Sequence, residues 1–410
     1  MYKGFILILC LIISGCAGQQ QANNELANLL YNQDPQRVLD KLQVSEPAKR
    51  DFAQFHLNLG LLQFMTADFK SAIATLSLAK REMAVLAASS VSENIGAGSV
   101  NETLRSYSGY PTDRVMVHTI LALSYLFNND IDGARVEVLQ ADIAMKKLTE
   151  QHALNGQLAS AHLLAGIIYE LLDEQSNALI SYRNAADIIQ QRGLVLPLGL
   201  QQALLRNSFK LGAEEQYAAY KKQFPSLATP TNNNKSQVFA LYFDGVVSSK
   251  IQRSIVVPSL NGEQLIRISM PDYPAKSAPI EQAVIDLQRT QLVENIDSLV
   301  RDDLSKEYPS ILLLTTTRAI AKYQLVKKAD QEDSLFAALI NLVTLLTEVA
   351  DLRSWNMLPA TIQFAYIETP ESELLIDSRY NVSKKVTIKK GTKNIFLINS
   401  LSNNIFHYQQ

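Results

Sequence analysis

The chain has 410 residues, of which 47% are hydrophobic and 19% are charged, and its formal net charge is −2. This composition is ordinary for a folded globular protein and excludes extensive disorder. A net charge so close to zero gives no indication of a nucleic-acid partner, which normally requires a basic face. The length predicts two domains, or a repeat domain with a second domain appended.

The first residues have the order of a secretory signal peptide. A weakly basic start with Lys3 precedes the apolar run Phe5–Ile13, which is too short to cross a bilayer that requires about 20 apolar residues. Ile13-Ser14-Gly15-Cys16 then resembles the lipobox of bacterial lipoproteins. The resemblance implies that the Cys16 thiol is diacylated, that residues 1–15 are cleaved off as a signal peptide, and that the new amino group is acylated.

Lipidation would leave the mature chain without a thiol. Cys10 lies in the segment that would be removed and Cys16 would become a thioether, which excludes a disulfide scaffold and a thiol enzyme. Several acyl chains bind a membrane stably, and residues 16–24 would form a polar tether. Ala17 stands where an inner-membrane retention signal has Asp, which favours the periplasmic face of the outer membrane by resemblance to enterobacterial sorting rules. A cleaved soluble protein and an uncleaved anchor are the alternatives.

Residues 25–225 have a helical period and predict a TPR-like α-helical repeat domain. The segments Phe52–Arg81, Val115–Lys147 and Leu158–Gln190 align with the TPR helix–turn–helix pattern, and a degenerate pair over Leu204–Phe224 resembles a terminal cap. The pattern requires small residues where two helices approach closely and aromatic residues between successive pairs. We expect these packing positions at Gly60, Ala72, Ala79, Ala122, Tyr125, Ala134, Ala141, Gly166, Tyr169, Ala178, Tyr182 and Ala185. An irregular helical bundle is the alternative.

A polar insertion rich in Ser, Gly and Asn spans Ala87–Tyr110 and predicts a loop between the first two repeats. Insertions in solenoids fall on one face and often contact a partner, although a simple spacer would have the same composition.

We interpret residues 226–236 as a linker. After it, the predicted secondary structure changes from helices alone to a mixture of strands and helices. Residues 237–410 predict an α+β domain that resembles a β-sandwich with a helical insertion. We expect strands over Val238–Phe243, Ile251–Val257, Leu265–Ser269, Thr361–Glu368, Glu373–Ile376, Val382–Ile388 and Asn394–Ile398, and helices over Ser310–Lys327 and Ser334–Leu352.

The segment 334–350 is apolar on nearly all sides, which is typical of a buried helix. The alternative is an exposed helix that contacts a second copy of the chain in a homo-oligomer.

Five lysines lie among the last predicted strands. Basic residues on an edge strand discourage aggregation, whereas contacts to an anionic partner such as peptidoglycan or a lipid phosphate are the functional alternative. The residues are Lys384, Lys385, Lys389, Lys390 and Lys393.

Motifs for catalysis and metal binding are absent from the sequence. No HExxH or GxSxG motif is present, and Asp130-Ile131-Asp132-Gly133 lacks the remaining ligands of a calcium loop. The acidic pairs Asp302-Asp303 and Glu332-Asp333 flank predicted helices, where carboxylates stabilise N-termini. We therefore expect no catalytic residue, no metal and no cofactor apart from the lipid on Cys16. An envelope hydrolase that uses these acidic pairs is the alternative.

Two stretches carry a resemblance to a known family. Tyr107–Ile143 and Arg353–Glu371 are similar to a widespread, largely uncharacterised family of TPR-like lipoproteins of Gram-negative bacteria, in which a Pro-Gly often stands where this chain has Pro370-Glu371. The family has no established catalytic residues, so the resemblance implies none here. Its genes often lie beside those of outer-membrane lipoproteins that activate peptidoglycan synthases, which implies a role in envelope assembly.

The sequence thus predicts a non-enzymatic, lipid-anchored periplasmic scaffold that binds an envelope protein in the concave groove of its repeats. A peptidoglycan- or lipid-binding module that uses the lysines and Trp355 is the second hypothesis, and the hydrolase is the third.

Overall fold

The structure is a computed structural model. It describes residues 24–32, 34–93, 106–149, 154, 156–230, 235–259, 264–275, 280–330, 334–346 and 348–410. The expected signal peptide and Cys16 lie outside these ranges, as does Glu332-Asp333. Within them, every helix is too short or too polar to cross a bilayer.

An α-helical region precedes an α+β region. Residues 24–30 are helical, and a 3-10 turn at Lys49–Asp51 leads into a series of antiparallel helix pairs. The helices are α2 (Pro35–Gln43), α3 (Phe52–Met65), α4 (Phe69–Glu93), α5 (Pro111–Phe127), α6 (Ile131–Thr149), α7 (Ala159–Leu171), α8 (Gln175–Gln191), α9 (Leu198–Lys210) and α10 (Glu214–Gln223). Because α4 runs to Glu93, the start of the insertion expected at Ala87–Tyr110 is helical, and residues 94–105 lie outside the described residues.

The same turn joins the two helices of four successive pairs. Two positions after the first helix ends, the backbone adopts a left-handed conformation, at Ala67 (φ 67°), Asn129 (φ 61°), Asp173 (φ 56°) and Gly212 (φ 65°). The next amide donates to the carbonyl five residues back, from Asp68 to Gln63, Asp130 to Tyr125, Glu174 to Tyr169 and Ala213 to Ser208, at 2.9–3.0 Å. These are the two features of a Schellman motif, and they recur in register.

Small residues bring the helices of a pair together. A Cβ atom added to Gly60 would lie 2.6 Å from the Leu76 side chain, and one added to Gly166 would lie 2.5 Å from the ring of Tyr182. Both partners lie 16 positions further along the chain. The buried pair Ala122 and Val138 has the same spacing between α5 and α6.

The C-terminal half contains two packed sheets and a separate hairpin. The five-stranded sheet has the order β11-β10-β1-β7-β6, in which β1 and β10 are parallel and the other pairs are antiparallel. The four-stranded sheet has the order β5-β4-β8-β9, and β2 pairs only with β3. The strands are β1 (Ser236–Asp244), β2 (Ile251–Pro258), β3 (Leu265–Asp272), β4 (Val284–Ile285), β5 (Gln288–Arg289), β6 (Gln291–Asn295), β7 (Thr361–Thr369), β8 (Glu373–Ser378), β9 (Asn381–Thr387), β10 (Lys393–Asn399) and β11 (Ile405–Gln409).

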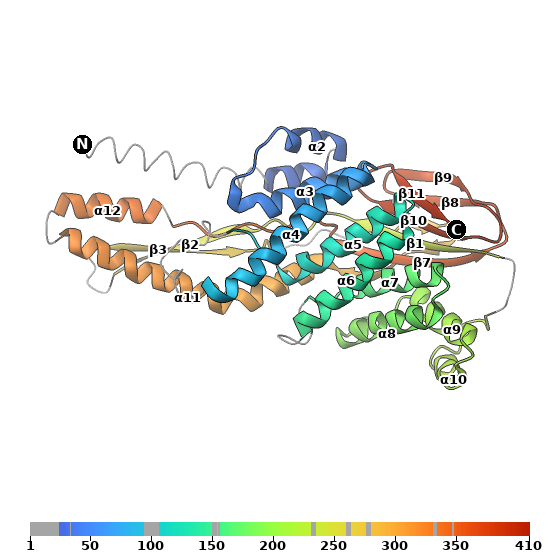
Figure 1. Ribbon diagram of the computed structural model, residues 1–410. Coiled ribbons are helices and arrows are strands. Elements are labelled where there is room, and N and C mark those ends of the chain that lie inside the picture. The colour runs from blue at the N-terminus through green and yellow to red at the C-terminus, as the bar shows by residue number, and fades with distance from the viewer. Residues whose placement is uncertain are drawn as a thin grey trace.

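The five-stranded sheet is covered on both faces, because successive side chains of a strand point to opposite sides. In β1, Phe239 and Leu241 belong to the core shared with the helices, whereas Val238 and Ala240 pack against the four-stranded sheet. The sheets therefore form a sandwich with the helical region on its outer side, and Figure 1 shows the helices and the sheet side by side.

Within each pair, the first helix lies against the sheet. Contacts join α5 to β11, α7 to β6 and α9 to β7, and Phe64 of α3 meets Phe406 of β11 at 5.5 Å between ring centroids. All residues of α7 are buried, whereas α10, the second helix of the last pair, has no buried residue. The face expected to form an open groove is thus occupied by the protein's own sheet.

The helix α11 (Ile296–Asp330) is longer than the sequence predicted, because it continues through Pro309. A proline inside a helix costs about 3 kcal/mol, which favoured a start at Ser310. The part before Pro309 is held by tertiary packing, with Val300 and Leu304 buried and Asp303 accepting a hydrogen bond from the Thr112 amide of α5 at 3.0 Å. Asp303 therefore stabilises the first turn of another helix.

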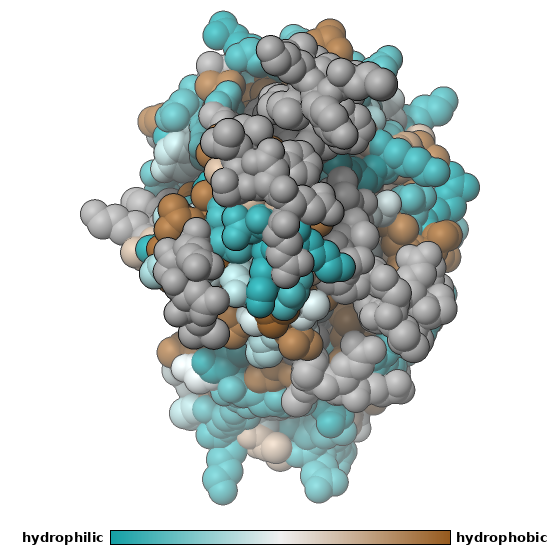
Figure 2. Space-filling view, turned by 90° about the vertical axis from the view of Figure 1, so that its left-hand side faces the viewer, coloured by the Kyte–Doolittle hydropathy of each residue, from teal (hydrophilic) through white to brown (hydrophobic). Residues whose placement is uncertain are grey.

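One end of the molecule is an arm that consists of β2, β3, α12 (Ser334–Leu346) and the part of α11 after Pro309 (Figure 1). Its own small core contains Val326, Ala329 and Ala337, packed against Ile340. Burial of the segment 334–350 was expected, but among its described side chains Leu342 is 53% exposed. Figure 2 looks at this end and shows apolar side chains in several separate patches between hydrophilic ones.

Candidate binding pocket between α9 and β7

A cavity of about 420 Å³ lies where the helical region meets the sheet. One wall is α9, with Gln202 and Arg206, and another is β7 from Tyr366 to Glu368. The segment 227–230 and the turn between β4 and β5 complete the lining. This position is typical of a ligand site, since such sites gather between structural units.

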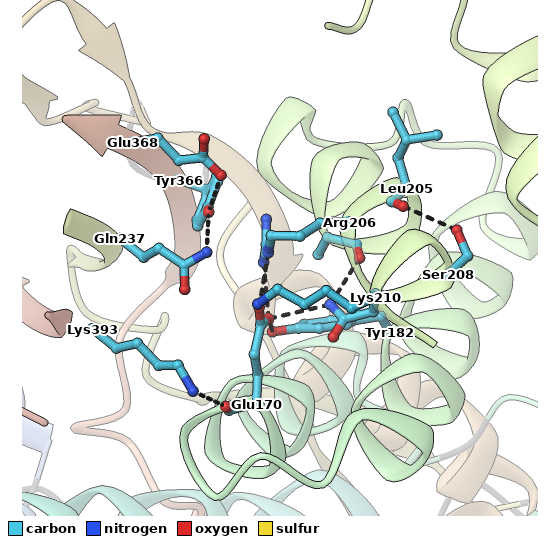
Figure 3. Close-up of polar contacts among 12 residues, drawn as sticks. Glu170, Tyr182, Leu205, Arg206, Ser208, Lys210, Gln237, Tyr366, Glu368 and Lys393 are labelled. Carbon is cyan, nitrogen blue, oxygen red and sulfur yellow. Dashed lines mark hydrogen bonds and ion pairs between the residues drawn. The ribbon is translucent and has the colours of Figure 1, made fainter. Parts of the chain in front are cut away.

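The wall at α9 is fixed by a buried ion pair. Glu170 lies at the end of α7 and is fully buried, and its carboxylate accepts two hydrogen bonds from Arg206 Nε and Nη2, each at 2.8 Å. Tyr182 donates to the same carboxylate at 3.0 Å, and Asn207 donates at 3.2 Å. Figure 3 shows Tyr182 of α8 and Arg206 of α9 converging on Glu170.

The network keeps its charges in the folded state. Burial alone would raise the pKa of Glu170, but the charge and hydrogen bonds of Arg206, with Lys210 and Asn207, lower that pKa to about 2. Burial alone would lower the pKa of the Arg206 guanidinium, but the Glu170 carboxylate raises that pKa above its ordinary value. Burial and the nearby carboxylate raise the pKa of Tyr182, so its hydroxyl remains a donor. The bidentate geometry fixes the plane of the guanidinium.

The Arg206 guanidinium also stacks on the sheet. Its Cζ atom lies 3.9 Å from the centroid of the Tyr366 ring, a cation–π contact between α9 and β7. Tyr366 in turn donates to Glu368 at 2.7 Å and accepts from Gln237 at 3.0 Å (Figure 3). The two walls of the cavity are thereby held at a fixed separation.

Two polar atoms on the α9 wall have no hydrogen-bond partner among the described residues. They are Arg206 Nη1 and Gln202 Oε1, and both atoms are buried. Arg206 as a whole is 4% exposed. A buried polar atom without a partner costs about 1–3 kcal/mol. Other buried atoms of the described residues, such as Gln63 Oε1 and Ser160 Oγ, also lack a hydrogen-bond partner.

The expected repeat-packing residues lie between the helices. All are buried except Tyr125, which is half-buried, and Tyr182 combines this packing with its hydrogen bond to Glu170. Tyr125 packs on Gly133, where an added Cβ would lie 2.5 Å from its ring. Tyr182 is therefore the one member of this set that supports a wall of the cavity.

The five lysines do not form one surface. Lys384 and Lys385 lie on β9, an edge strand of the four-stranded sheet, while Lys389 and Lys390 follow that strand, and all four are exposed. Lys393 lies instead on β10, where it donates to Asp173 at 2.6 Å and to the Glu170 carbonyl oxygen at 2.7 Å. Lys393 therefore joins the sheet to the helices.

Trp355 is fully buried, so it cannot serve as the contact with the cell wall that the second hypothesis required. It lies beside a cluster of paired charges at the base of the arm. There Arg353 binds Asp351 at 2.6 Å and Asp51 at 3.2 Å, and Lys250 donates to the Tyr110 hydroxyl at 2.5 Å. Burial lowers the pKa of Lys250 to about 8. The bonds from Arg353 to Asp51 and from Lys250 to Tyr110 connect the segments that border the arm to the helical region.

Asp303, one of the acidic residues of the hydrolase hypothesis, is buried against α5 and does not flank a helix. Burial raises its pKa to about 7, and its hydrogen bond from Thr112 opposes that rise. Across the described ranges, no group of three or more His, Cys, Asp or Glu side chains has an arrangement that would hold a metal ion.

The second helices of the pairs expose apolar side chains on their outer face. On α6, Val136 is 52% exposed, Leu139 is 41% exposed and Ile143 is 36% exposed. Their spacing places them on one side of the helix. Leu78 and Val85 of α4 and Ile180 of α8 are also exposed on neighbouring helices.

The site residues predicted from the sequence did not include Gln202, Arg206 or Glu170. A usable signal was present, since Glu170 is the only charged residue of α7 and Arg206 follows a Leu-Leu pair on α9. A charge inside an apolar helix face usually has a buried partner. The partner, however, lies 36 residues away along the chain.

No known family model and no curated protein sequence matches this chain. Among solved structures, the chain is similar to the crystal structure of BtubC (BKLC) from P. vanneervenii, with 17% sequence identity over 57% of this chain and 88% of that chain. The TM-score of this match is 0.32, which is too low to support an argument about fold or function.

Proposed function

We propose that this chain is a non-enzymatic, lipid-anchored scaffold at the periplasmic face of the outer membrane, and that its helix pairs are a TPR-like repeat. The four equivalent turns and the close approaches at Gly60 and Gly166 support the repeat. The lipobox-like segment that ends at Cys16 supports the anchor.

The observation that carries the scaffold function is the apolar stripe on α6, formed by Val136, Leu139 and Ile143. Solenoid repeats usually bind partners on a concave surface, but here the sheet lies against the first helices of the pairs. The outer face of α4, α6 and α8 is therefore the partner-binding surface that we propose. Apolar side chains gathered on an exposed face are typical of a protein interface.

A photo-crosslinking amino acid at position 136 tests this surface in living cells. We expect one envelope protein to be captured, and we expect Leu139→Glu to abolish the capture because it places a charge inside the interface. Gln140→Glu introduces the same charge at the neighbouring exposed position and should leave the capture intact. Equal capture with Leu139→Glu and Gln140→Glu would contradict the proposed surface.

The anchor is tested separately. Cys16→Ser should move the protein from the membrane fraction to the soluble fraction, and globomycin should block processing of the unsubstituted chain. A Cys16→Ser protein that remains in the membrane fraction would contradict the lipid anchor without affecting the surface on α6.

A further inference from the structure

We propose that the outer side of α11 in the arm lies on the surface of the lipid bilayer that holds the anchor at Cys16. This inference deepens the proposed function and rests on its lipid anchor, but it does not involve the surface on α6.

The exposed side of α11 between Ser310 and Leu325 carries no charge. A helix that faces water normally has charged and polar residues on its outer side. Here Leu313 is 69% exposed and Ile320 is 58% exposed, and two helical turns separate them, so both lie on one side of the helix. All exposed residues of this part of α11 are uncharged, namely Ser310, Leu312, Leu313, Thr316, Thr317, Ile320, Ala321, Gln324 and Leu325. At 1.5 Å per residue, this uncharged face is about 23 Å long.

The charged residues of the same part of α11 point into the arm. Arg318 Nη2 lies 3.2 Å from Glu348 Oε1, and Lys322 Nζ lies 2.6 Å from Glu348 Oε2. Arg318 is 4% exposed and Glu348 is 2% exposed. This helix therefore has its charges on the inner side and an uncharged surface outside, which favours a neighbour that is itself apolar.

An anchor on Cys16 would hold the bilayer close to the base of the arm. The described chain begins at Asn24, whose side chain donates to the Lys250 carbonyl oxygen at 3.1 Å and accepts from the Asn356 side chain at 2.9 Å. Lys250 directly precedes β2, so Asn24 is fixed where the arm begins. The eight residue steps from Asn24 back to Cys16 span at most about 28 Å, even when fully extended. The bilayer surface must therefore lie within that distance of the base of the arm.

The end of the uncharged face suits a surface of lipid headgroups. Lys327 and Lys328 are exposed in the last turn of α11, which ends at the exposed Asp330. The long stem of a lysine can lie along apolar surface while its ammonium group reaches the headgroup phosphates. The two lysines would thus bind phosphates beside the apolar contact.

A fluorescent label on this face tests the contact. The mature chain has no free thiol once residues 1–15 are removed and Cys16 carries lipid, so one new cysteine gives one labelling position. Leu313→Cys and Ile320→Cys are labelled with NBD, and the lipidated full chain is reconstituted in vesicles of phosphatidylethanolamine and phosphatidylglycerol. We expect nitroxide-labelled lipids to quench the fluorescence at both positions.

Val382→Cys is the matched control, because Val382 of β9 is 82% exposed and β9 lies at the opposite end of the molecule (Figure 1). Nitroxide lipids should leave its label unquenched.

A charge placed on the face tests its apolar character. Thr317→Glu should reduce the quenching at positions 313 and 320, because a carboxylate resists transfer out of water. Ser305→Glu introduces the same charge at an exposed position of α11 before Pro309, outside the arm, and should leave the quenching unchanged. Thermal unfolding confirms that each variant is folded.

Flotation of the vesicles separates failure of the anchor from failure of the arm contact. If the unsubstituted chain does not float with the vesicles, the anchor is overturned, and this proposal with it. Floating protein whose arm labels are quenched no more than the label at position 382 overturns the arm contact alone. Blue-shifted arm labels that nitroxide lipids do not quench would show that a second copy of the chain covers the face, which also overturns the proposal. Equal quenching with Thr317→Glu and Ser305→Glu would do the same.

Discussion

We expect buried charged residues to have the largest single-residue effects on the stability of this protein. Glu170 is fully buried and has its negative charge matched by Arg206 and Lys210. Removing one partner of a buried ion pair leaves the other without compensation, which costs far more than the loss of an exposed pair.

Glu170→Gln should therefore lower the free energy of unfolding at pH 7 by about 3 kcal/mol. Because the pKa of Glu170 is lowered to about 2, its contribution is present above its ordinary pKa of 4.5 and is lost as the pH falls from 4.5 to 2. The difference between the variant and the unsubstituted chain should shrink over that interval. Urea unfolding at several pH values measures both effects.

Glu174→Gln is the matched control, because Glu174 binds Arg135 at the surface, where the two side chains are 28% and 40% exposed. Glu174→Gln should lower the free energy of unfolding by less than about 1 kcal/mol. Equal losses in the two variants would contradict the structural role of the buried pair.

His162 of α7 gives the protein a second dependence on pH. Burial lowers its pKa from 6.5 to about 4. The unfolded chain then binds a proton at a higher pH than the folded chain does, so stability falls as the pH drops from 6.5 to 4. We expect protonation of His162 to lower the free energy of unfolding by up to about 3 kcal/mol over this interval. His162→Gln should lose less stability than the unsubstituted chain over this interval, as measured by urea unfolding at pH 7 and pH 4.5. Parallel losses would show that His162 does not carry this dependence.

At the scale of elements, local patterns in the sequence predicted the helix pairs and most of the strands. Gly166 and Tyr182 are 16 positions apart, so their contact follows from the period of two neighbouring helices. The contact between Arg206 and Tyr366 spans 160 positions and depends on how the sheet meets the helices, which no local pattern reveals. The predicted start of α11 at Ser310 was wrong for a similar reason. Contacts with residues distant in the sequence stabilise the helical turns before Pro309.

The arm should be the least stable element of the described chain. β2 pairs only with β3, and most of its residues are exposed, whereas β1 is buried between β7 and β10. A two-stranded hairpin is only marginally stable unless something packs on it. Amide hydrogens of Arg253–Val257 should therefore exchange faster than those of Val238–Tyr242 in a mass-spectrometric exchange experiment. Equal protection of the two strands would contradict this order.

The arm also exposes large apolar side chains. Ile255 is 60% exposed and Leu313 is 69% exposed. The homo-oligomer considered for the apolar segment 334–350 would therefore use several arm elements together.

On the scale of the whole molecule, the helical region and the sheet share one core. Phe406 of β11 packs against Phe64, Phe69 and Phe127, and Phe364 of β7 packs against Gly199 of α9. The sequence predicted the two regions and their order, with residues 226–236 as the linker between them. Leu227 of that segment is 8% exposed and belongs to the shared core.

A fragment of residues 24–230 should consequently fail to fold cooperatively. Without the sheet, the first helices of the pairs would expose apolar faces to water. We expect a broad thermal transition by circular dichroism and strong binding of the dye ANS, whereas the full chain should unfold in one transition without dye binding at ambient temperature. A fragment that melts sharply and binds no dye would show that the helices form an independent domain.

The pairing of β1 has a consequence for how the protein folds during its synthesis. Its neighbours in the sheet are β7 and β10, which lie more than 100 residues further along the chain. During synthesis or threading across a membrane, the helices emerge long before the strands that cover them. The apolar faces of these helices stay exposed until the strands emerge. Long-range strand pairing is slow even then. We therefore expect the newly made chain to need a holding chaperone until β11, which packs against α3 and α5, has emerged.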